Sequence, residues 1–214
     1  MSPDPQWLLA APEAVASGSA AVLVPVKAFH DAKRRLSSEL STEERATLAR
    51  TLAEGVVAAA APLPCAVACD SEEVALWAQD LDLILLEMPP SDLNEAVSEG
   101  LRRLWAMGAG EVVVASGDLP GARDLSRLTG FAGVTIVPDR GEQGTNVLCL
   151  PRNSTLQVSY GPGSFRRHLR LAALAGTPAR VLRMPELMLD IDLPEDLRDA
   201  VLAKRDSGLS PPSN

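Results

Sequence analysis

The sequence predicts a single-domain α/β protein with a mostly parallel central sheet and helices on both faces. Short apolar runs of Val, Ala and Leu recur along the chain, and most show no alternation with polar residues. Such runs are typical of strands buried on both faces, as in a parallel sheet covered by helices. Longer helical patterns separate the runs, so strand and helix alternate. The 214 residues are 46% hydrophobic, which is enough for one large core.

We expect the folded domain to occupy residues 20–206, with a flexible segment at each end. Residues 1–19 are rich in Pro, Ala and Ser, and they lack the basic start and continuous apolar centre of a secretory signal. They predict a loose N-terminal extension. Residues 207–214 predict a flexible C-terminal tail.

The first half of the chain predicts four buried strands separated by helices or loops. The strands are expected at residues 20–26, 65–69, 83–86 and 111–115. Ser41 or Thr42 is expected to cap a helix that runs to about residue 61, because acids occupy its first turn. Further helices are predicted at residues 72–79 and from Asp92 to about residue 107.

The fourth predicted strand is followed by a carboxylate, Asp118, around which we expect the site to be built. Gly117 allows a sharp turn after the strand, and Pro120 prevents the strand from continuing. Open α/β sheets bind ligands just beyond such strand ends, where a metal or a phosphate-bearing ligand can reach the carboxylate. An isolated Asp at this place is also a common helix cap or turn residue. The assignment therefore depends on its neighbours.

The second half predicts shorter elements around polar loops. Strands are expected at residues 133–137, 147–150, 155–160 and 179–182. The middle two are candidates for an antiparallel excursion from the parallel sheet. Helices are expected at residues 124–129, from Ser164 to about residue 175, and at residues 195–204. Residues 138–146 form a polar loop punctuated by glycines.

Composition excludes several classes of protein. Twenty basic and 28 acidic residues give a net charge of −8, which argues against a nucleic-acid binder with a broad basic surface. The apolar run at residues 56–61 is too short to cross a membrane. We therefore expect no nucleic-acid or membrane partner and a cytoplasmic location. The cysteines, Cys65, Cys69 and Cys149, lack the paired spacing of zinc ligands and predict packing residues.

Asp190 and Asp192 form a second group of candidate metal ligands. They flank one apolar residue, so both carboxylates point to the same side of an extended segment. Two like charges held together favour a nearby cation. With Asp118 they would complete an oxygen-rich site for magnesium, which prefers carboxylates and phosphate oxygens. The alternative is that one Asp caps the following helix and the other is solvated.

Basic residues follow the first strand. Lys27, Lys33 and Arg35 lie where a nucleoside triphosphate would bind in an open α/β sheet, although an ordinary solvated loop would look the same. The chain contains neither a Walker sequence nor Gly-x-Gly-x-x-Gly, so side-chain cations must bind much of the phosphate charge.

A second candidate phosphate site lies at residues 161–168. Ser164 is placed to cap a helix beside Arg166 and Arg167, and a helix amino end attracts anions. Neither His30 nor His168 has a persuasive nucleophile beside it in the sequence. We expect His168 to be a polar residue on the face of its helix.

Eight short motifs occur in the order found in one family. They are Val-Pro-Val-Lys27, Ala-Lys33-x-Arg35-Leu, Leu-Asn94-x-Ala, Gly-Asp118-Leu-Pro, Pro-Asp-Arg140, Gly-Thr145-Asn, Gly161-Pro-Gly-Ser164-Phe-x-x-His168 and Leu-Asp190-Ile-Asp192-x-Pro-Glu-Asp-Leu. Over about residues 20–204 the chain resembles the phosphoenolpyruvate or 2-phospho-L-lactate guanylyltransferases of deazaflavin coenzyme biosynthesis.

The resemblance implies a Rossmann-like nucleotidyltransferase that moves GMP from GTP to the phosphate of a three-carbon acid and releases pyrophosphate. The family pattern implies metal binding by Asp118, Asp190 and Asp192, and acceptor binding by Thr145, Gly161 and Ser164. The predicted nucleotide-binding residues are Lys27, Lys33, Arg35 and Asn94, and the predicted catalytic residues are Asp118, Lys27 and Lys33. Magnesium is the expected cofactor.

Several alternatives stay open. Arg34 stands where a small hydroxyl residue is usual in the family, Leu193 where Thr is common, and the loop before Gly144 is shortened. The sequence is also compatible with a transferase that uses another nucleotide or phosphorylated acceptor, and with a protein that binds nucleotide without catalysis. It is compatible with a monomer or a homodimer. Phosphoenolpyruvate is favoured over 2-phospho-L-lactate, because the Ala, Arg and Leu content suggests a GC-rich bacterial source.

Overall fold

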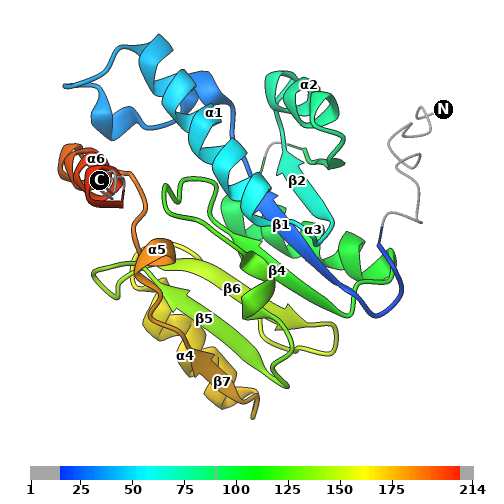
Figure 1. Ribbon diagram of the computed structural model, residues 1–214. Coiled ribbons are helices and arrows are strands. Elements are labelled where there is room, and N and C mark those ends of the chain that lie inside the picture. Colours follow the sequence, from blue (N-terminus) through cyan, green and yellow to red (C-terminus); the bar gives the residue numbers. More distant parts are fainter. Residues whose placement is uncertain (1–14, 90, 208–214) are drawn as a thin grey trace, which may run out of the picture.

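A computed structural model describes residues 15–89 and 91–207, which form a seven-stranded sheet with helices on both faces (Figure 1). The order of strands across the sheet is β3-β2-β1-β4-β6-β5-β7. Their bounds are β1 Ala20–Pro25, β2 Cys65–Cys69, β3 Ile84–Glu87, β4 Glu111–Ala115, β5 Val134–Pro138, β6 Thr145–Pro151 and β7 Ala179–Val181. The predicted flexible ends fall largely on residues 1–14 and 208–214, which lie outside the described residues.

The sheet is parallel except for β6. Strand β1 pairs in parallel with β2 and β4, β2 with β3, and β5 with β7. Strand β6 pairs antiparallel with both β4 and β5. This reversed strand confirms the antiparallel excursion predicted near residue 147. It also brings the start of β6 beside the carboxyl end of β4, since Ala115 pairs with Val147.

Helices cover both faces of the sheet, as predicted. Buried side chains of α1 (Thr42–Ala59), α2 (Glu72–Asp80) and α5 (Pro185–Met188) join one apolar core, and those of α3 (Leu93–Ala106) and α4 (Ser164–Leu174) join the other. Alternate residues of β1 supply the two cores: Val22 and Val24 face one, and Ala21 and Leu23 the other. Helix α6 (Pro194–Ser207) lies beside α1 (Figure 1), where Ala200 joins a cluster with Leu52.

The predicted helix starts are confirmed in detail at two places. Ser41 accepts a hydrogen bond from the Glu44 backbone, and the Glu44 carboxylate accepts one from the Ser41 backbone. Asp92 and Glu95 form the same reciprocal arrangement at the start of α3. Such capping boxes satisfy backbone donors that a helix leaves unpaired. No described helix combines the length and apolarity needed to cross a membrane.

The second half departs from the sequence analysis at three places. Residues 155–160 form no strand; their backbone is bonded largely by side chains, those of Asn94, Arg167 and His168 among them. The short helix predicted at residues 124–129 forms, but as a 3-10 helix over Leu125–Leu128. Helix α5 was not predicted, because a single turn of four residues leaves little periodicity.

Candidate active site

A cleft of about 590 Å³ opens at the carboxyl ends of β1 and β4. Its walls come from the loop after β1, the loop after β4, the start of β6, the turn before α4 and the segment between α5 and α6. This is where open α/β sheets place their ligands. All the predicted site residues except Asn94 line it: Lys27, Lys33, Arg35, Asp118, Thr145, Gly161, Ser164, Asp190 and Asp192.

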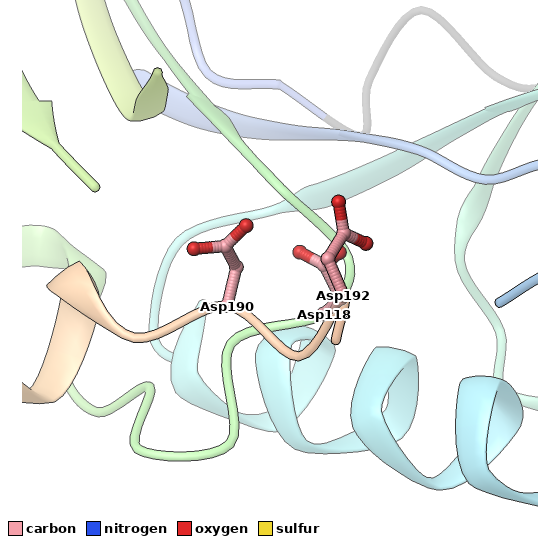
Figure 2. A group of neighbouring side chains, drawn as sticks. All are labelled: Asp118, Asp190 and Asp192. Atoms are coloured by element: carbon pink, nitrogen blue, oxygen red, sulfur yellow. The ribbon is translucent and has the colours of Figure 1, made fainter. Parts of the chain in front are cut away.

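The three predicted metal ligands lie together. One carboxylate oxygen from each of Asp118, Asp190 and Asp192 can be chosen so that all lie within 4.8 Å of one another. Figure 2 shows the side chains projecting from two neighbouring segments, Asp118 from the loop after β4 and the other two from the segment after α5. We call these residues the acidic triad.

Backbone contacts join the two segments that carry the acidic triad. The Ile191 backbone N–H donates to the Asp118 carbonyl at 3.3 Å. Gly121 packs against α5 so closely that a Cβ at this position would lie 2.7 Å from the carbonyl oxygen of Glu186. A glycine at residue 121 therefore lets the loop after β4 approach α5 and the segment that follows it.

Neither Asp190 nor Asp192 shows a helix-capping bond. At the start of α6 it is Asp196 whose carboxylate accepts hydrogen bonds from the backbone N–H groups of Asp192 and Leu193, at 3.1 and 2.7 Å. Asp118 accepts a hydrogen bond from the Ser116 hydroxyl at 2.7 Å. Asp196 therefore caps α6, and Asp190 and Asp192 line the cleft.

The environment of Asp190 raises the pKa of its carboxyl group. Burial, followed by the nearby negative charges of Asp118 and Asp192, raises its pKa to about 6. The Asn146 amide donates to Asp190 Oδ1 at 3.4 Å and to the Leu187 carbonyl at 3.0 Å. Asn146 therefore links β6 to the segment that carries Asp190. Its position after Thr145 in a motif was the only sequence signal for this role.

Lys33 contacts the acidic triad directly. Its ammonium Nζ lies 2.5 Å from Asp118 Oδ2 and 3.3 Å from Asp192 Oδ1, and its side chain is only 8% exposed. Burial lowers the pKa of Lys33, but the two carboxylates outweigh burial and the net effect is a raised pKa. The Lys33 backbone is left-handed, with φ of 54°.

The other predicted cations are more exposed. Arg35 lines the cleft with a side chain that is 72% exposed, and its Nη1 lies 3.6 Å from Asp192 Oδ2. Lys27 is also exposed and lines the cleft, two residues after the end of β1. The basic loop is therefore not uniformly solvated: Lys33 is buried in ion pairs, and Lys27 and Arg35 face open space.

Asn94 lies at the first turn of α3 and bonds to the backbone of Tyr160. Its Oδ1 accepts from the Tyr160 N–H at 2.5 Å, and its Nδ2 donates to the Tyr160 carbonyl at 3.5 Å. Its amide thus connects α3 to the irregular loop that carries Gly161. Sequence reasoning, which grouped Asn94 with the nucleotide, did not reveal this contact.

The predicted acceptor residues meet at one wall of the cleft. Thr145 starts β6, Gly161 lies in the turn before α4, and Ser164 is the first residue of α4. The expected cap by Ser164 was wrong: Gly163 is the N-cap, with φ of 75°, and the Ser164 hydroxyl instead donates to Thr145 Oγ1 at 3.3 Å. A glycine suits this left-handed position because it has no Cβ.

The expectations for Arg167 and His168 also need correction. Arg167 donates to carbonyls of the preceding loop, among them Ser159 at 3.0 Å and Pro162 at 3.0 Å, so its guanidinium braces that loop. Neither Arg166 nor Arg167 lines the cleft. His168 is fully buried instead of lying on a polar face. Residue type and spacing gave no signal for either contact, since both involve bends of the preceding loop.

The donor set of the acidic triad fits a hard divalent cation. Three carboxylates from two segments face one point of the cleft, and magnesium binds through one or more carboxylates while it keeps sites for water and phosphate oxygens. Holding these like charges together is costly without positive charge, which Lys33 provides in part.

Comparisons with known proteins identify the family. A family model described as "Guanylyl transferase CofC like" matches residues 20–208. Phosphoenolpyruvate guanylyltransferase of Rubrobacter xylanophilus is 36% identical over 184 residues, covering 82% of this chain and 90% of that protein. 2-phospho-L-lactate guanylyltransferase of Archaeoglobus fulgidus is 34% identical over 184 residues, covering 85% of this chain and 82% of that protein.

Solved structures show the same fold at low sequence identity. A candidate nucleotide-diphospho-sugar transferase from Desulfovibrio desulfuricans G20 superposes with a TM-score of 0.73 at 16% identity, covering 90% of each chain. A nucleotidyl transferase from Methanothermobacter gives a TM-score of 0.62 at 16% identity, covering 89% of this chain and all of that one. The family match and the sequence identities together show that the chain belongs to the CofC-like guanylyltransferase family.

Proposed function

We propose that this protein is a magnesium-dependent guanylyltransferase that transfers GMP from GTP to the phosphate of phosphoenolpyruvate. The observation that carries the proposal is that one cleft holds the acidic triad, exposed cations beside β1 and a hydroxyl-lined turn at the start of α4. A reaction between two phosphate-bearing substrates needs these three features within reach of one another.

The nucleotide side of the cleft is proposed to be the loop after β1. Lys27 and Arg35 are exposed there and supply positive charge for a triphosphate. Lys33 lies between this loop and the triad, where its ammonium can neutralise charge close to the reacting phosphate. With no Walker motif in the chain, side-chain cations take a large share of the phosphate contacts.

The acceptor side is proposed to be the wall formed by Thr145, Gly161 and Ser164. The hydroxyls of Thr145 and Ser164 and the amino end of α4 suit an anion that carries both carboxylate and phosphate groups. Five relatives named for phosphoenolpyruvate are matched over 89–98% of their length, and three named for 2-phospho-L-lactate over 74–83%. This difference favours phosphoenolpyruvate as the acceptor, with 2-phospho-L-lactate as the second candidate.

In the proposed reaction, an oxygen of the acceptor phosphate attacks the α-phosphorus of GTP. The bond from that phosphorus to the bridging oxygen of the β-phosphate breaks, and pyrophosphate leaves. The acceptor phosphate is already an anion, so no general base has to remove a proton from it. The acidic triad would hold magnesium, which stabilises negative charge on the phosphates when bound. The chain's part is to bind, align and neutralise two polyanions.

Product analysis tests the proposal. The protein is incubated with GTP and magnesium together with phosphoenolpyruvate, 2-phospho-L-lactate or 3-phosphoglycerate, and the products are identified by mass spectrometry. We expect a guanylylated acid and an equal amount of pyrophosphate, most rapidly with phosphoenolpyruvate, and no product after chelation of magnesium. A product from CTP or ATP at the same rate, or no guanylylated product from any of the three acids, would contradict the proposal.

A further inference from the structure

A chain of buried hydrogen bonds lies behind the acceptor wall of the cleft. Thr145 Oγ1 lies 3.0 Å from His168 Nδ1 and 3.3 Å from the Ser164 hydroxyl. Thr145 is 7% exposed, His168 0% and Ser164 1%, so all three side chains are buried. On the far side of the imidazole, the Ser159 backbone N–H reaches His168 Nε2 at 2.9 Å.

The Ser159 contact decides where the imidazole carries its proton. A backbone N–H can only donate, so His168 Nε2 must accept and cannot itself hold a proton. Burial, with the neighbouring Arg167 charge, lowers the pKa of His168 to about 4, so the ring is neutral near pH 7. A neutral ring with an unprotonated Nε2 has its proton on Nδ1. His168 Nδ1–H therefore donates to Thr145 Oγ1.

The direction of this bond determines what Thr145 offers to the cleft. Its hydroxyl oxygen accepts from His168 Nδ1–H and from the Ser164 hydroxyl, which occupies both of its lone pairs. What remains is the proton of the Thr145 hydroxyl, and among the described residues no bond uses that proton. Since Thr145 lines the cleft, the proton is available to an anionic oxygen of a ligand.

We propose that His168 is a positioning residue that makes the Thr145 hydroxyl a hydrogen-bond donor to the anionic acceptor. This inference rests on the proposed function, because it places the acceptor at Thr145 and Ser164. Without the His168 Nδ1–H bond, the Thr145 proton is free to turn away from the cleft. A hydroxyl lone pair would then face the anion and weaken its binding.

The surroundings of His168 hold the ring in the required orientation. Tyr160 packs edge-on against it, with ring centroids 5.2 Å apart and an angle of 78° between the planes. The Tyr160 backbone is in turn bonded to the Asn94 amide, and Arg167 braces the Ser159 carbonyl. The loop at residues 159–160 thus supplies both the hydrogen-bond donor and the packing that orient the imidazole.

A matched pair of variants tests the role of Nδ1–H. In His168→Asn the amide nitrogen takes roughly the place of Nδ1 and can still donate to Thr145. In His168→Gln the amide reaches the place of Nε2 and can accept from Ser159, but the Thr145 contact is lost. We expect His168→Gln to raise the KM for phosphoenolpyruvate at least about tenfold, the effect of losing a hydrogen bond to a charged group. His168→Asn should raise it less, and both should leave the KM for GTP within about twofold.

A double-variant comparison tests whether His168 acts through Thr145. Thr145→Val removes the hydroxyl while it keeps the shape, and Thr145→Ser keeps the hydroxyl. We expect Thr145→Val to raise the KM for phosphoenolpyruvate as much as His168→Gln does, and the combined variant to lose little more than either alone. Thr145→Ser should retain most of the affinity. Additive losses in the combined variant, or equal losses of both substrates in His168→Gln and His168→Asn, would overturn the proposal.

The tautomer can be measured on the unaltered protein. The chain has only two histidines, His30 and His168, so their nitrogen signals in a long-range proton–nitrogen NMR spectrum are readily assigned, with exposed His30 as the internal control. We expect His168 to hold its proton on Nδ1; a proton on Nε2 would overturn the proposal without any assay. If the unaltered protein guanylylates none of the tested acids, the proposed function fails whichever tautomer is seen, so the two failures are distinguishable.

Discussion

Lys33 Nζ lies 2.5 Å from Asp118 Oδ2, and the side chain of the lysine is 8% exposed and that of the aspartate 20%. The same ammonium reaches Asp192 Oδ1 at 3.3 Å. Lys33 thereby supplies positive charge to the acidic triad as well as lying at the proposed nucleotide side of the cleft. Removing the lysine from such a buried ion pair strongly destabilises the folded protein, because the remaining carboxylates lose their compensating charge.

Replacing Lys33 should affect stability as well as activity. We expect Lys33→Ala to lower the thermal midpoint in the presence of a chelator, and magnesium to raise that midpoint more in the variant than in the unaltered protein. The reason is that an added cation supplies the charge that the variant lacks. Thermal unfolding with and without magnesium measures both effects.

Lys27→Ala is the matched control for Lys33→Ala. Lys27 is exposed and lines the cleft, so its replacement should leave the thermal midpoint unchanged and raise the KM for GTP more than that for the acceptor. A raised KM for the acceptor alone would place this loop at the wrong substrate. Equal destabilisation by the two variants would show that the Lys33 ion pairs carry no special weight.

Asp118→Asn should abolish most turnover while the protein still folds, with a lower thermal midpoint because Lys33 keeps only its Asp192 partner. The amide retains the shape of the side chain but removes the charge that the proposed magnesium site requires, and we expect kcat to fall by roughly 100-fold or more. Magnesium-dependent pyrophosphate release measures turnover, and thermal unfolding measures the fold. Asp80→Asn, an exposed change at the end of α2, is the control and should leave both unchanged. Near-normal turnover in Asp118→Asn would remove Asp118 from the metal site.

Asp190→Asn should stabilise the chelator-treated protein, and the gain should depend on pH. The pKa of Asp190 is raised from 3.8 to about 6, so the folded state holds this proton more tightly than the unfolded state does. Ionisation of Asp190 therefore costs stability as pH rises between these two values, and the cost is fully present above pH 6.

The expected gain for Asp190→Asn at pH 7.5 is modest because solvent reaches part of the site. A gain of about 1 kcal/mol would raise the thermal midpoint by roughly 2–4 °C in a protein of this size. The difference between variant and unaltered protein should shrink as pH falls toward 4. A gain that does not change with pH, or a loss of stability at pH 7.5, would contradict the assigned environment of Asp190.

Asn94→Ala separates two roles for Asn94. The Asn94 amide bonds to the Tyr160 backbone, and Tyr160 precedes the turn proposed to hold the acceptor. If Asn94 acts by holding that loop, the variant should raise the KM for the acceptor several-fold and leave the KM for GTP nearly unchanged. The opposite pattern, a raised KM for GTP alone, would restore the nucleotide-binding role predicted from the sequence motif. Initial rates with each substrate varied in turn decide between them.

Gly121→Ala should weaken the metal site without touching a ligand. The added Cβ would lie 2.7 Å from the Glu186 carbonyl, so α5 and the segment carrying Asp190 must shift. Overpacking of this kind costs roughly 1–3 kcal/mol. We expect a lower thermal midpoint and weaker magnesium binding by calorimetry. The control is Gly55→Ala within α1, where a Cβ meets nothing within 4 Å and should stabilise the helix.

The sequence by itself determined the alternation of strands and helices and the identity of the three acids. Buried strands such as Glu111–Ala115 and capped helices such as Thr42–Ala59 are specified by residues that are neighbours in the chain, so their patterns are visible without a structure. The positions of Asp118, Asp190 and Asp192 after such elements indicated a shared edge of the sheet, and the structure brings their carboxylates together there.

Only the tertiary structure decided how the polar side chains around those acids are paired. Asn94 and Tyr160 are 66 residues apart, and Lys33 and Asp118 are 85 residues apart, so no local pattern records their contacts. The segment at residues 155–160 has strand-like composition but bonds largely to side chains, which leaves His168 buried and Arg167 bound to the loop. Hydrogen-bond partners are chosen by proximity in the folded chain, and a buried polar group takes whichever partner the packing brings within reach.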